Sequence, residues 1–354
     1  MRTFWLLPLI GVALMAQSNP EVPPPFRVTT ERVVAPVTVF DRNGSTVNGI
    51  DPTQFHLFDN NKEQNIEVDI TYQPISLVIC IQANSHVEGV LPQVRRIGNL
   101  VAPLMIGDQG QAAVIAYDGR IRTLQQFTSN PDLITQAVKS IQPGSDSNRM
   151  VDAVIEGARM LDKQPVNRRR ILLVVGETRD LGSEGRAREA LIDVQLTNTV
   201  VYAVDMSRFL TTLSAPPIQP RPDTQLPTAY PLPANTPATP TSVQQTFGTN
   251  GASAQFIPLM VELLKDVKAI FKDNPIELFT KGSGGSEFSF YRQRGLEEAI
   301  SKIGEELHSQ YLISYSPNNK LEGGFHQILV EVEGHPEIKR IQTRPGYWLA
   351  ASNQ

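Results

Sequence analysis

The pattern of apolar and polar positions divides the chain into two kinds of segment. Residues 26–73 and 310–348 alternate apolar and polar side chains between turn signals such as 41–44, which is typical of half-buried antiparallel strands. Each stretch is short for an independently stable sheet. We therefore predict that the two segments pair into one small, antiparallel β-sandwich-like module, with the rest of the chain inserted between them.

The inserted residues 75–309 change to nearly continuous apolar runs that alternate with helical patterns. Such runs suit strands buried on both faces, and their alternation with helices predicts βαβ units. The expected fold class is α/β, with a doubly wound, mostly parallel sheet of Rossmann-like type. The expected strands are 75–81, 112–117, 171–175 and 200–204, and the expected helices are 90–104, 131–141, 151–161, 187–196, 256–271 and 296–307, with Gly282–Gly285 as a loop.

Residues 214–250 interrupt this pattern with a stretch rich in proline, threonine and glutamine. No apolar period survives there, and this composition cannot bury enough apolar surface to offset the entropy lost on ordering. We predict a disordered insert within the α/β domain. The alternative is a polyproline docking peptide, because Pro217–Pro220 and Pro237–Pro240 fit the spacing of such peptides.

The first residues indicate the compartment. Arg2 precedes an apolar stretch from Phe4 to Met15 and the small residue Ala16, which is the layout of a secretory signal peptide. The stretch is shorter than the ~20 residues that span a bilayer, so residues 1–16 are interpreted as a cleaved signal, the alternative being a membrane anchor. We expect a secreted or periplasmic protein with no stable membrane span after cleavage.

Composition narrows the classes of function. Lys and Arg number 32 against 36 Asp and Glu, which gives a net charge of −4. No basic stripe is visible, so a nucleic-acid partner is not expected. The single cysteine, Cys80, excludes an intrachain disulfide and any metal site built from several thiolates. Within its apolar strand, Cys80 is expected to be a small core residue.

Segments at the ends of the expected strands resemble a known family. Residues 82–86 stand where von Willebrand factor A domains carry Asp-x-Ser-x-Ser, and 146–153 is similar to that family's Gly-Gly-Thr-x-Leu-x-Asp-Ala. Residues 171–180 resemble its strand followed by Asp-Gly. The flanks resemble those of acidobacterial-type, VWFA-related secreted bacterial proteins, at 37–44, 51–55, 310–315 and 344–347. The resemblance spans 26–348 and implies a vWA-type fold.

The same resemblance implies a metal-ion-dependent adhesion site, or MIDAS, and this sequence has lost its residues. The family's first Asp falls on Gln82, its two Ser on Asn84 and His86, its Thr on Asn148 and its last Asp on Glu177. One carboxylate is little charge for Mg²⁺, which prefers several hard oxygen ligands. We therefore predict a degenerate, metal-free site with no cofactor. The alternative is a softer metal held by His86 and Glu177.

These positions still predict a binding surface. In open α/β sheets, ligands bind outside the carboxyl ends of the strands. We expect a polar surface there, which we name the rim, formed by Gln82, Asn84, Ser85, His86, Asn148 and Glu177. Arg149, Thr178 and Arg179 flank the rim.

The expected function is an extracytoplasmic protein-binding, adhesion or scaffolding module with a protein partner. The alternatives are a secreted hydrolase and a binder that uses a non-standard divalent metal. The sequence lacks the Gly-x-Ser-x-Gly of a nucleophile elbow and the Gly-x-Gly-x-x-Gly of a nucleotide site after its first strand. No catalytic residues are therefore assigned, and the chain is not expected to be an enzyme.

Overall fold

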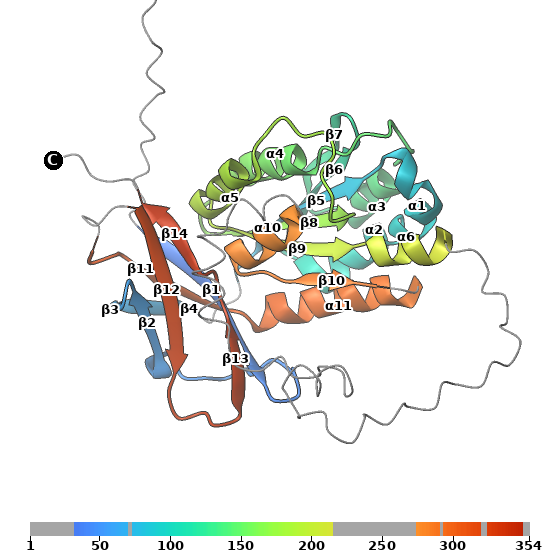
Figure 1. Cartoon of the computed structure of the whole chain (residues 1–354). Coiled ribbons are helices and arrows are strands. Elements are labelled where there is room, and N and C mark those ends of the chain that lie inside the picture. The colour runs from blue at the N-terminus through green and yellow to red at the C-terminus, as the bar shows by residue number, and fades with distance from the viewer. Residues whose placement is uncertain (1–31, 70–72, 215–273, 291–292, 320–323, 350–354) are drawn as a thin grey trace, which may run out of the picture.

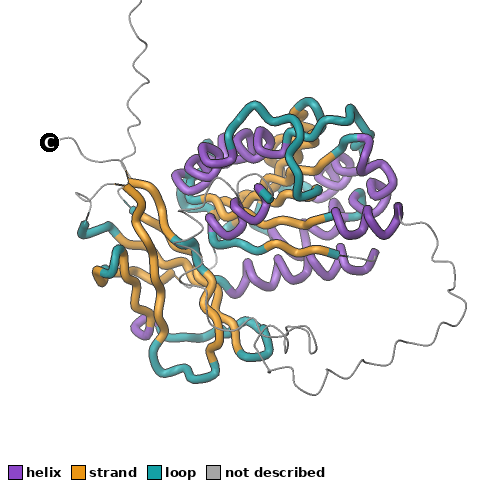
Figure 2. Tube along the Cα trace, viewed as in Figure 1, coloured by secondary structure: helices purple, strands orange, loops and turns teal. Residues whose placement is uncertain are grey.

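The computed structural model describes residues 32–69, 73–214, 274–290, 293–319 and 324–349. The expected signal peptide at 1–16, nearly all of the insert at 214–250 and the expected helix at 256–271 lie outside these residues. Two parts stand side by side in Figure 1: a β-rich module and an α/β domain. Figure 2 shows the same division, with strands alone forming most of the module and helices enclosing the sheet of the α/β domain.

The α/β domain is built on a six-stranded sheet of order β10-β9-β8-β5-β6-β7. When these six strands are numbered 1 to 6 along the chain, the order read from β7 to β10 is 3-2-1-4-5-6, that of a doubly wound sheet. All pairs are parallel except the hairpin of β6 with β7. The strands are β5 (Ile75–Gln82), β6 (Gln111–Tyr117), β7 (Ile121–Thr128), β8 (Arg169–Gly176), β9 (Thr199–Asp205) and β10 (Glu287–Ser289). The predicted α/β class is thereby confirmed.

Helices cover both faces of this sheet because the central strands are apolar on both faces. All eight residues of β5 are buried. One face packs against α1 (Leu91–Val94), α2 (Ile97–Val101), α3 (Pro131–Lys139), α6 (Ser207–Ser214) and α11 (Gln293–Ser309). The other packs against α4 (Met150–Asp162), α5 (Ala187–Leu196) and α10 (Pro275–Ser283). Cys80 is buried on the second face, as expected.

The helix predicted at 90–104 is wrong as a single element. The chain forms a 3-10 helix η2 (Ser85–Val90), the short helices α1 and α2, and a π-helical turn η3 (Ala102–Ile106). Pro92 and Pro103 lack the N–H that a continuous helix needs, and Pro103 also excludes the regular bond to residue 99. A π-helical turn accommodates that gap.

The loop predicted at Gly282–Gly285 is wrong in its first half. Gly282 and Ser283 are the last residues of α10, which begins after the cap Asn274 with Pro275 in its first turn. Gly284 then ends the helix with φ of +85°, a left-handed conformation that suits glycine.

The β-rich module joins the two ends of the described chain. Its two four-stranded sheets have the orders β13-β1-β11-β4 and β14-β12-β2-β3, with every pair antiparallel. Each sheet takes strands from both flanks, so the predicted module is confirmed. The strands are β1 (Val33–Asp41), β2 (Phe55–Asp59), β3 (Lys62–Glu63), β4 (Ile66–Asp69), β11 (Tyr311–Tyr315), β12 (Gly324–Val332), β13 (Ile338–Gln342) and β14 (Gly346–Leu349), with a 3-10 turn η1 (Pro52–Gln54).

A buried polar cluster lies inside this module. The Asp59 carboxylate is fully buried and accepts hydrogen bonds from the hydroxyls of Tyr315 at 2.9 Å and Tyr347 at 2.7 Å. Asn319 Nδ2 donates to it at 3.0 Å, and His326 Nδ1 lies 2.7 Å from it. These residues come from both flanks, so the cluster ties the N-terminal strand β2 to the C-terminal strands.

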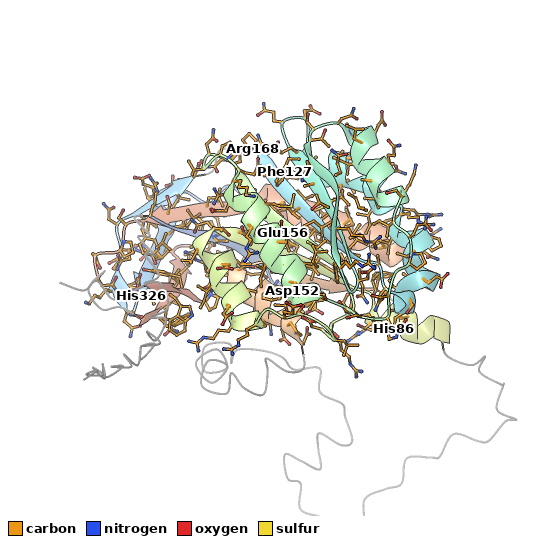
Figure 3. All side chains as sticks on the ribbon, turned by 90° about the horizontal axis from the view of Figure 1, so that it is seen from above. His86, Phe127, Asp152, Glu156, Arg168 and His326 are labelled. Carbon is orange, nitrogen blue, oxygen red and sulfur yellow. The ribbon has the colours of Figure 1, made fainter. Side chains whose placement is uncertain are left out.

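The module also contacts the α/β domain directly. Gln195 at the end of α5 donates to the carbonyl of Gly282 at 2.8 Å and to that of Gly346 in β14 at 3.2 Å. Arg169 at the start of β8 donates to Gln310 at 2.5 Å. The flanks therefore hold the α/β domain at the end opposite the carboxyl edge of its sheet. In Figure 3 His326 of the module and His86 of the rim lie at opposite ends of the molecule.

Candidate functional site

The strand order of the sheet reverses between β5 and β8, and the carboxyl ends of these strands mark the place where α/β sheets bind ligands. Gln82 is the last residue of β5, and Glu177 follows the last residue of β8. Both are residues of the predicted rim. The structure thus brings the segments that carry the family resemblance to one edge of the sheet.

Hydrogen bonds between rim residues fill this position. Gln82 Nε2 donates to Asn84 Oδ1 at 2.9 Å and to Glu177 Oε2 at 2.8 Å. The backbone N–H of Glu177 donates to Gln82 Oε1 at 2.6 Å. Gln82 and Asn84 are fully buried, whereas Glu177 is half-buried. The Gln82 amide therefore links the two strand ends and supplies a donor to the Glu177 carboxylate.

Glycine at position 176 is required by the close packing under this network. A Cβ there would lie 2.2 Å from the Tyr117 hydroxyl and 2.8 Å from Gln82 Oε1. The Tyr117 hydroxyl is buried and has no hydrogen-bond partner among the residues that the structure describes. Burial raises the pKa of Tyr117 well above its ordinary value, so its phenol stays neutral.

The remaining rim residues lie in the two loops beside this network. Asn148 is buried, and its Nδ2 donates to the Arg179 carbonyl at 2.7 Å, while its Oδ1 has no partner within the described part of the chain. The Ser85 hydroxyl donates to the Asp146 carboxylate. His86 is exposed on η2. The structure therefore joins Gln82, Asn84 and Glu177 directly, whereas Ser85 and Asn148 face other partners and His86 faces solvent.

The flanking residues have structural contacts of their own. Arg149 pairs with Asp152 at 2.7 Å and with Glu184 at 3.1 Å. Asp152 also accepts a hydrogen bond from the backbone N–H of Gly185 at 2.8 Å. The Thr178 N–H donates to Ser207 at 3.2 Å, and Arg179 is exposed. Arg149 thus fixes the segment 184–185 to α4, and Arg179 is the flanking side chain that reaches solvent.

These donors do not fit Mg²⁺. The Gln82 and Asn84 side-chain oxygens already accept hydrogen bonds, and an amide N–H points at the one carboxylate, Glu177. A cation there would have to displace that donor, and Mg²⁺ additionally needs near-octahedral oxygen ligands. A softer metal ion bound to Glu177 would also have to displace the Gln82 amide donor. Within the described ranges, no cluster of three or more His, Cys, Asp or Glu side chains has the arrangement of a metal site.

Two further carboxylates near the rim, Asp180 and Asp118, cap loops. Asp180 accepts from the N–H groups of Val151 at 3.1 Å and Ser183 at 3.1 Å, so it holds the start of α4. Asp118 accepts from the N–H of Arg120 at 2.8 Å and from Arg122 Nη2 at 3.0 Å. Each carboxylate is therefore bonded to donors of its own neighbouring loops.

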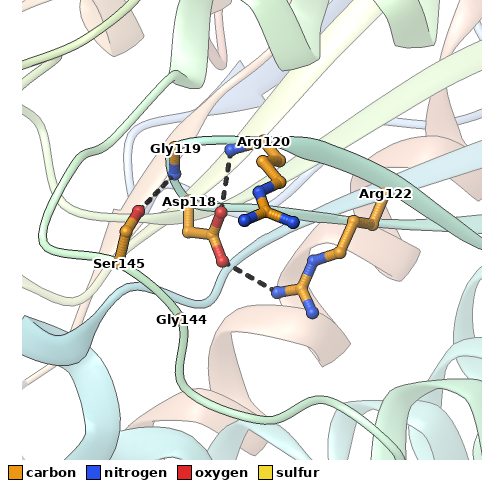
Figure 4. Close-up of a pocket in the computed structure, with 6 residues that line it drawn as sticks. All are labelled: Asp118, Gly119, Arg120, Arg122, Gly144 and Ser145. Atoms are coloured by element: carbon orange, nitrogen blue, oxygen red, sulfur yellow. Dashed lines mark hydrogen bonds and ion pairs between the residues drawn. The ribbon is translucent and has the colours of Figure 1, made fainter.

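A hollow lies beside the rim, where the sequence predicted none. It has a volume of about 440 Å³ and lies between the β6–β7 turn and the loop before α4 (Figure 4). Its lining residues are Asp118, Gly119, Arg120, Arg122, Gly144 and Ser145. The sequence feature that could have indicated the hollow is the Asp118-Gly119 turn. It indicates a hairpin only if residues 121–128 are recognised as the strand that follows it.

The contacts of Ser85 bear on the alternative of a secreted hydrolase. The Ser85 hydroxyl donates to Asp146, so the adjacent His86 is not its hydrogen-bond partner. Nucleophilic catalysis by serine needs a base within hydrogen-bond reach of the hydroxyl. A carboxylate alone in that place is a weak base at neutral pH. The described rim therefore carries hydrogen-bonding side chains, and its Ser85 hydroxyl is bonded to a carboxylate.

No protein-family profile matches the chain, and no curated protein matches it either. Among solved structures, it is similar to an aerotolerance-related membrane protein from Bacteroides fragilis, with 14% identity, a TM-score of 0.40, and 66% of this chain and 99% of that chain covered. It is similar to BatB from Bacteroides thetaiotaomicron, with 14% identity, a TM-score of 0.37, and coverage of 65% and 99%. The vWF domain of the type V pili tip protein Mfa5 from Porphyromonas gingivalis gives 17% identity, a TM-score of 0.25, and coverage of 29% and 38%.

The described helices include none that is both long and apolar enough to cross a bilayer. The strand order of the sheet itself gives the α/β domain its doubly wound, vWA-like architecture. The narrower resemblance to acidobacterial-type VWFA-related secreted proteins stays a prediction.

Proposed function

We propose that this chain is an extracytoplasmic protein-binding or scaffolding module that binds its partner through the rim without a divalent metal. The observation that carries the proposal is the hydrogen bond from Gln82 to Glu177 at 2.8 Å. The Gln82 side chain in this bond is a neutral amide, and it lies where the strand order reverses. The surface there carries one carboxylate that already has a donor, so no metal ion is needed to neutralise it. The predicted signal peptide supports the extracytoplasmic location.

The exposed side chains around the rim suit a surface that binds another protein. Leu181 is 62% exposed, and its backbone N–H donates to the Asn148 carbonyl at 3.1 Å, so this apolar side chain stands beside the rim. His86 and Arg179 are also exposed there. Protein interfaces combine an apolar core with a polar periphery, and arginine is enriched in them relative to the rest of the surface. An exposed leucine beside an arginine and a histidine is consistent with that composition.

Site-directed crosslinking tests this proposal. The only cysteine, Cys80, is buried, and burial raises the pKa of its thiol, so a maleimide should label introduced surface cysteines alone. A His86→Cys variant carrying a maleimide photocrosslinker is mixed with the extracytoplasmic fraction of the producing cells. The matched control is Leu133→Cys on α3, which is 41% exposed. We expect a discrete protein adduct from position 86 alone; equal adducts from both positions would contradict the proposal.

A further inference from the structure

We propose that the hollow between the β6–β7 turn and the loop before α4 binds a single carboxylate group, supplied by an acidic side chain of the partner. This inference rests on the proposed function, because it names the chemistry by which the rim's neighbourhood recognises that partner. It concerns groups that the rim itself does not include: Arg120, Arg122 and Ser145 (Figure 4).

The two guanidinium groups of the hollow differ in their partners. Arg122 Nη2 donates to the Asp118 carboxylate at 3.0 Å, and Asp118 is 5% exposed, so this pair is fixed and internally neutral. The Arg120 side chain is exposed, and within the described residues it has no ion pair. In Figure 4 its guanidinium lies beside that of Arg122, on the side of the turn that carries Asp118. The hollow therefore has one uncompensated positive charge on a group suited to bidentate recognition.

A hydroxyl completes the donor set. Ser145 Oγ accepts a hydrogen bond from the Gly119 N–H at 2.9 Å. A hydroxyl that accepts still has its own proton to donate. Ser145 lines the same hollow as Arg120, so the lining of the hollow includes a neutral donor and a cationic fork.

Close packing of two glycines preorganises these donors. A Cβ on Gly144 would lie 1.7 Å from Asp118 Oδ2, and a Cβ on Gly119 would lie 2.6 Å from Ser145 Oγ. The two loops can therefore approach one another only with glycine at both positions. The Gly144 N–H also donates to the Ala83 carbonyl at 2.6 Å, which ties the hollow to the segment that carries the rim.

Charge selects the ligand class. One net positive charge matches the single negative charge of a carboxylate. A phosphate carries between one and two negative charges at neutral pH, which is more than one guanidinium neutralises. The site therefore favours a carboxylate over a phosphate.

The position of the hollow indicates that the carboxylate belongs to a protein side chain. The Ser85 N–H donates to the Ser145 carbonyl at 3.2 Å, so a rim residue and a residue of the hollow are hydrogen-bonded neighbours. A partner docked over the rim reaches the hollow with a side chain at the edge of the contact. The hollow is partly open to solvent, as a site for a partner's side chain must be.

Titration of the ¹⁵N-labelled full chain tests the inference through the Gly119 amide resonance, at constant ionic strength. The probes are acetate, inorganic phosphate, a short peptide with one glutamate, and the same peptide with glutamine instead. We expect saturable shifts with acetate and the glutamate peptide, about tenfold weaker binding of phosphate, and no shift with the glutamine peptide. Arg120→Gln should weaken acetate binding about tenfold, with Arg120→Lys in between.

The control is Arg186→Gln, which removes an exposed charge outside the hollow and should leave acetate binding unchanged. Phosphate binding as tight as acetate, or unaltered binding by Arg120→Gln, would overturn the site. Acetate binding without binding of the glutamate peptide would overturn the side-chain source. Crosslinking from position 86 without carboxylate binding removes this inference and leaves the proposed function. Carboxylate binding without crosslinking removes the proposed function, and with it the partner as the source of the carboxylate.

Discussion

Gln82 Nε2 lies 2.8 Å from Glu177 Oε2, across the point where the strand order of the sheet reverses. This contact opposes metal binding at the edge of the sheet, because it places an amide donor where a cation would need an anionic oxygen. Under the proposed function, this surface binds its partner through hydrogen bonds and side-chain shape. The response of the protein to divalent metal therefore depends on this contact.

Divalent metal should leave the stability of the protein unchanged. A ligand that binds only the folded state at a hundred times its Kd adds about 2.7 kcal/mol. Because Glu177 is already hydrogen-bonded to a donor, we expect the same melting temperature in millimolar Mg²⁺ and in EDTA. Differential scanning calorimetry measures this, and a rise of several degrees with Mg²⁺ would show that the donor set does accept the ion.

Restoring the family residues should create the missing site. The variant combines Gln82→Asp, Asn84→Ser, His86→Ser, Asn148→Thr and Glu177→Asp. It replaces an amide–carboxylate contact by two carboxylates, so it should be less stable than the wild type in EDTA and should regain stability with Mg²⁺. Titration calorimetry measures the gained affinity. A variant that folds by circular dichroism yet binds no Mg²⁺ would refute the assignment of these five positions.

Asp152 should make the protein sensitive to acid. Burial raises the pKa of Asp152, but hydrogen bonds from the N–H groups of Gly185 and Glu184 and from Arg149 outweigh burial, so the pKa lies below its ordinary value. A lowered pKa stabilises the fold above the unfolded value of about 3.9, and that stability is lost as the pH falls through the folded value. Asp152→Asn should therefore cost about 1–3 kcal/mol at pH 7 and flatten the acid limb of the stability curve.

The matched control for Asp152 lies one turn along the same helix. Figure 3 shows Asp152 and Glu156 on α4. The Glu156 carboxylate is more exposed than that of Asp152, and its ion pair with Arg159 is long, at 4.0 Å. Glu156→Gln should leave both the stability and its pH dependence close to those of the wild type, as measured by urea unfolding between pH 3 and 7. Equal effects of the two substitutions would argue against the role given to Asp152.

The buried cluster in the module should be costly to disturb. Asp59→Asn turns an amide group toward donors that need an acceptor, and we expect a loss of about 3 kcal/mol or more in the free energy of unfolding. Tyr347→Phe removes a single hydrogen bond and should cost about 1–2 kcal/mol. Chemical denaturation of both variants measures this. A smaller loss for Asp59→Asn than for Tyr347→Phe would contradict the central place of the carboxylate.

The sequence predicted the buried strands of the sheet well, because each is an apolar run with little alternative. It did not predict β7, and the reason is physical. Ile121, Leu124 and Phe127 are the apolar residues of this strand and lie three apart, which is closer to a helical than a strand period. Irregular pairing with β6 breaks the alternation, with register shifts around Val114. From periodicity alone, a strand with such bulges cannot be told from a helix.

The candidate site was predictable in its positions but not in its bonds. The family resemblance placed Gln82 and Glu177 at the same edge, and the structure joins them. That the Gln82 amide would link Asn84 to Glu177 depends on side-chain orientations that the sequence does not encode locally. Arg120 belongs to no motif, and its place beside Ser145 depends on the close approach of two loops distant in sequence.

The most direct test of a metal-independent binding rim is crosslinking from position 86 with and without metal. The His86→Cys protein with its photocrosslinker is exposed to the extracytoplasmic fraction in EDTA and, separately, in millimolar Mg²⁺, with Leu133→Cys treated in parallel. We predict the same discrete adduct in equal yield under both conditions and its absence from position 133. An adduct that disappears in EDTA and returns with Mg²⁺ would contradict the account.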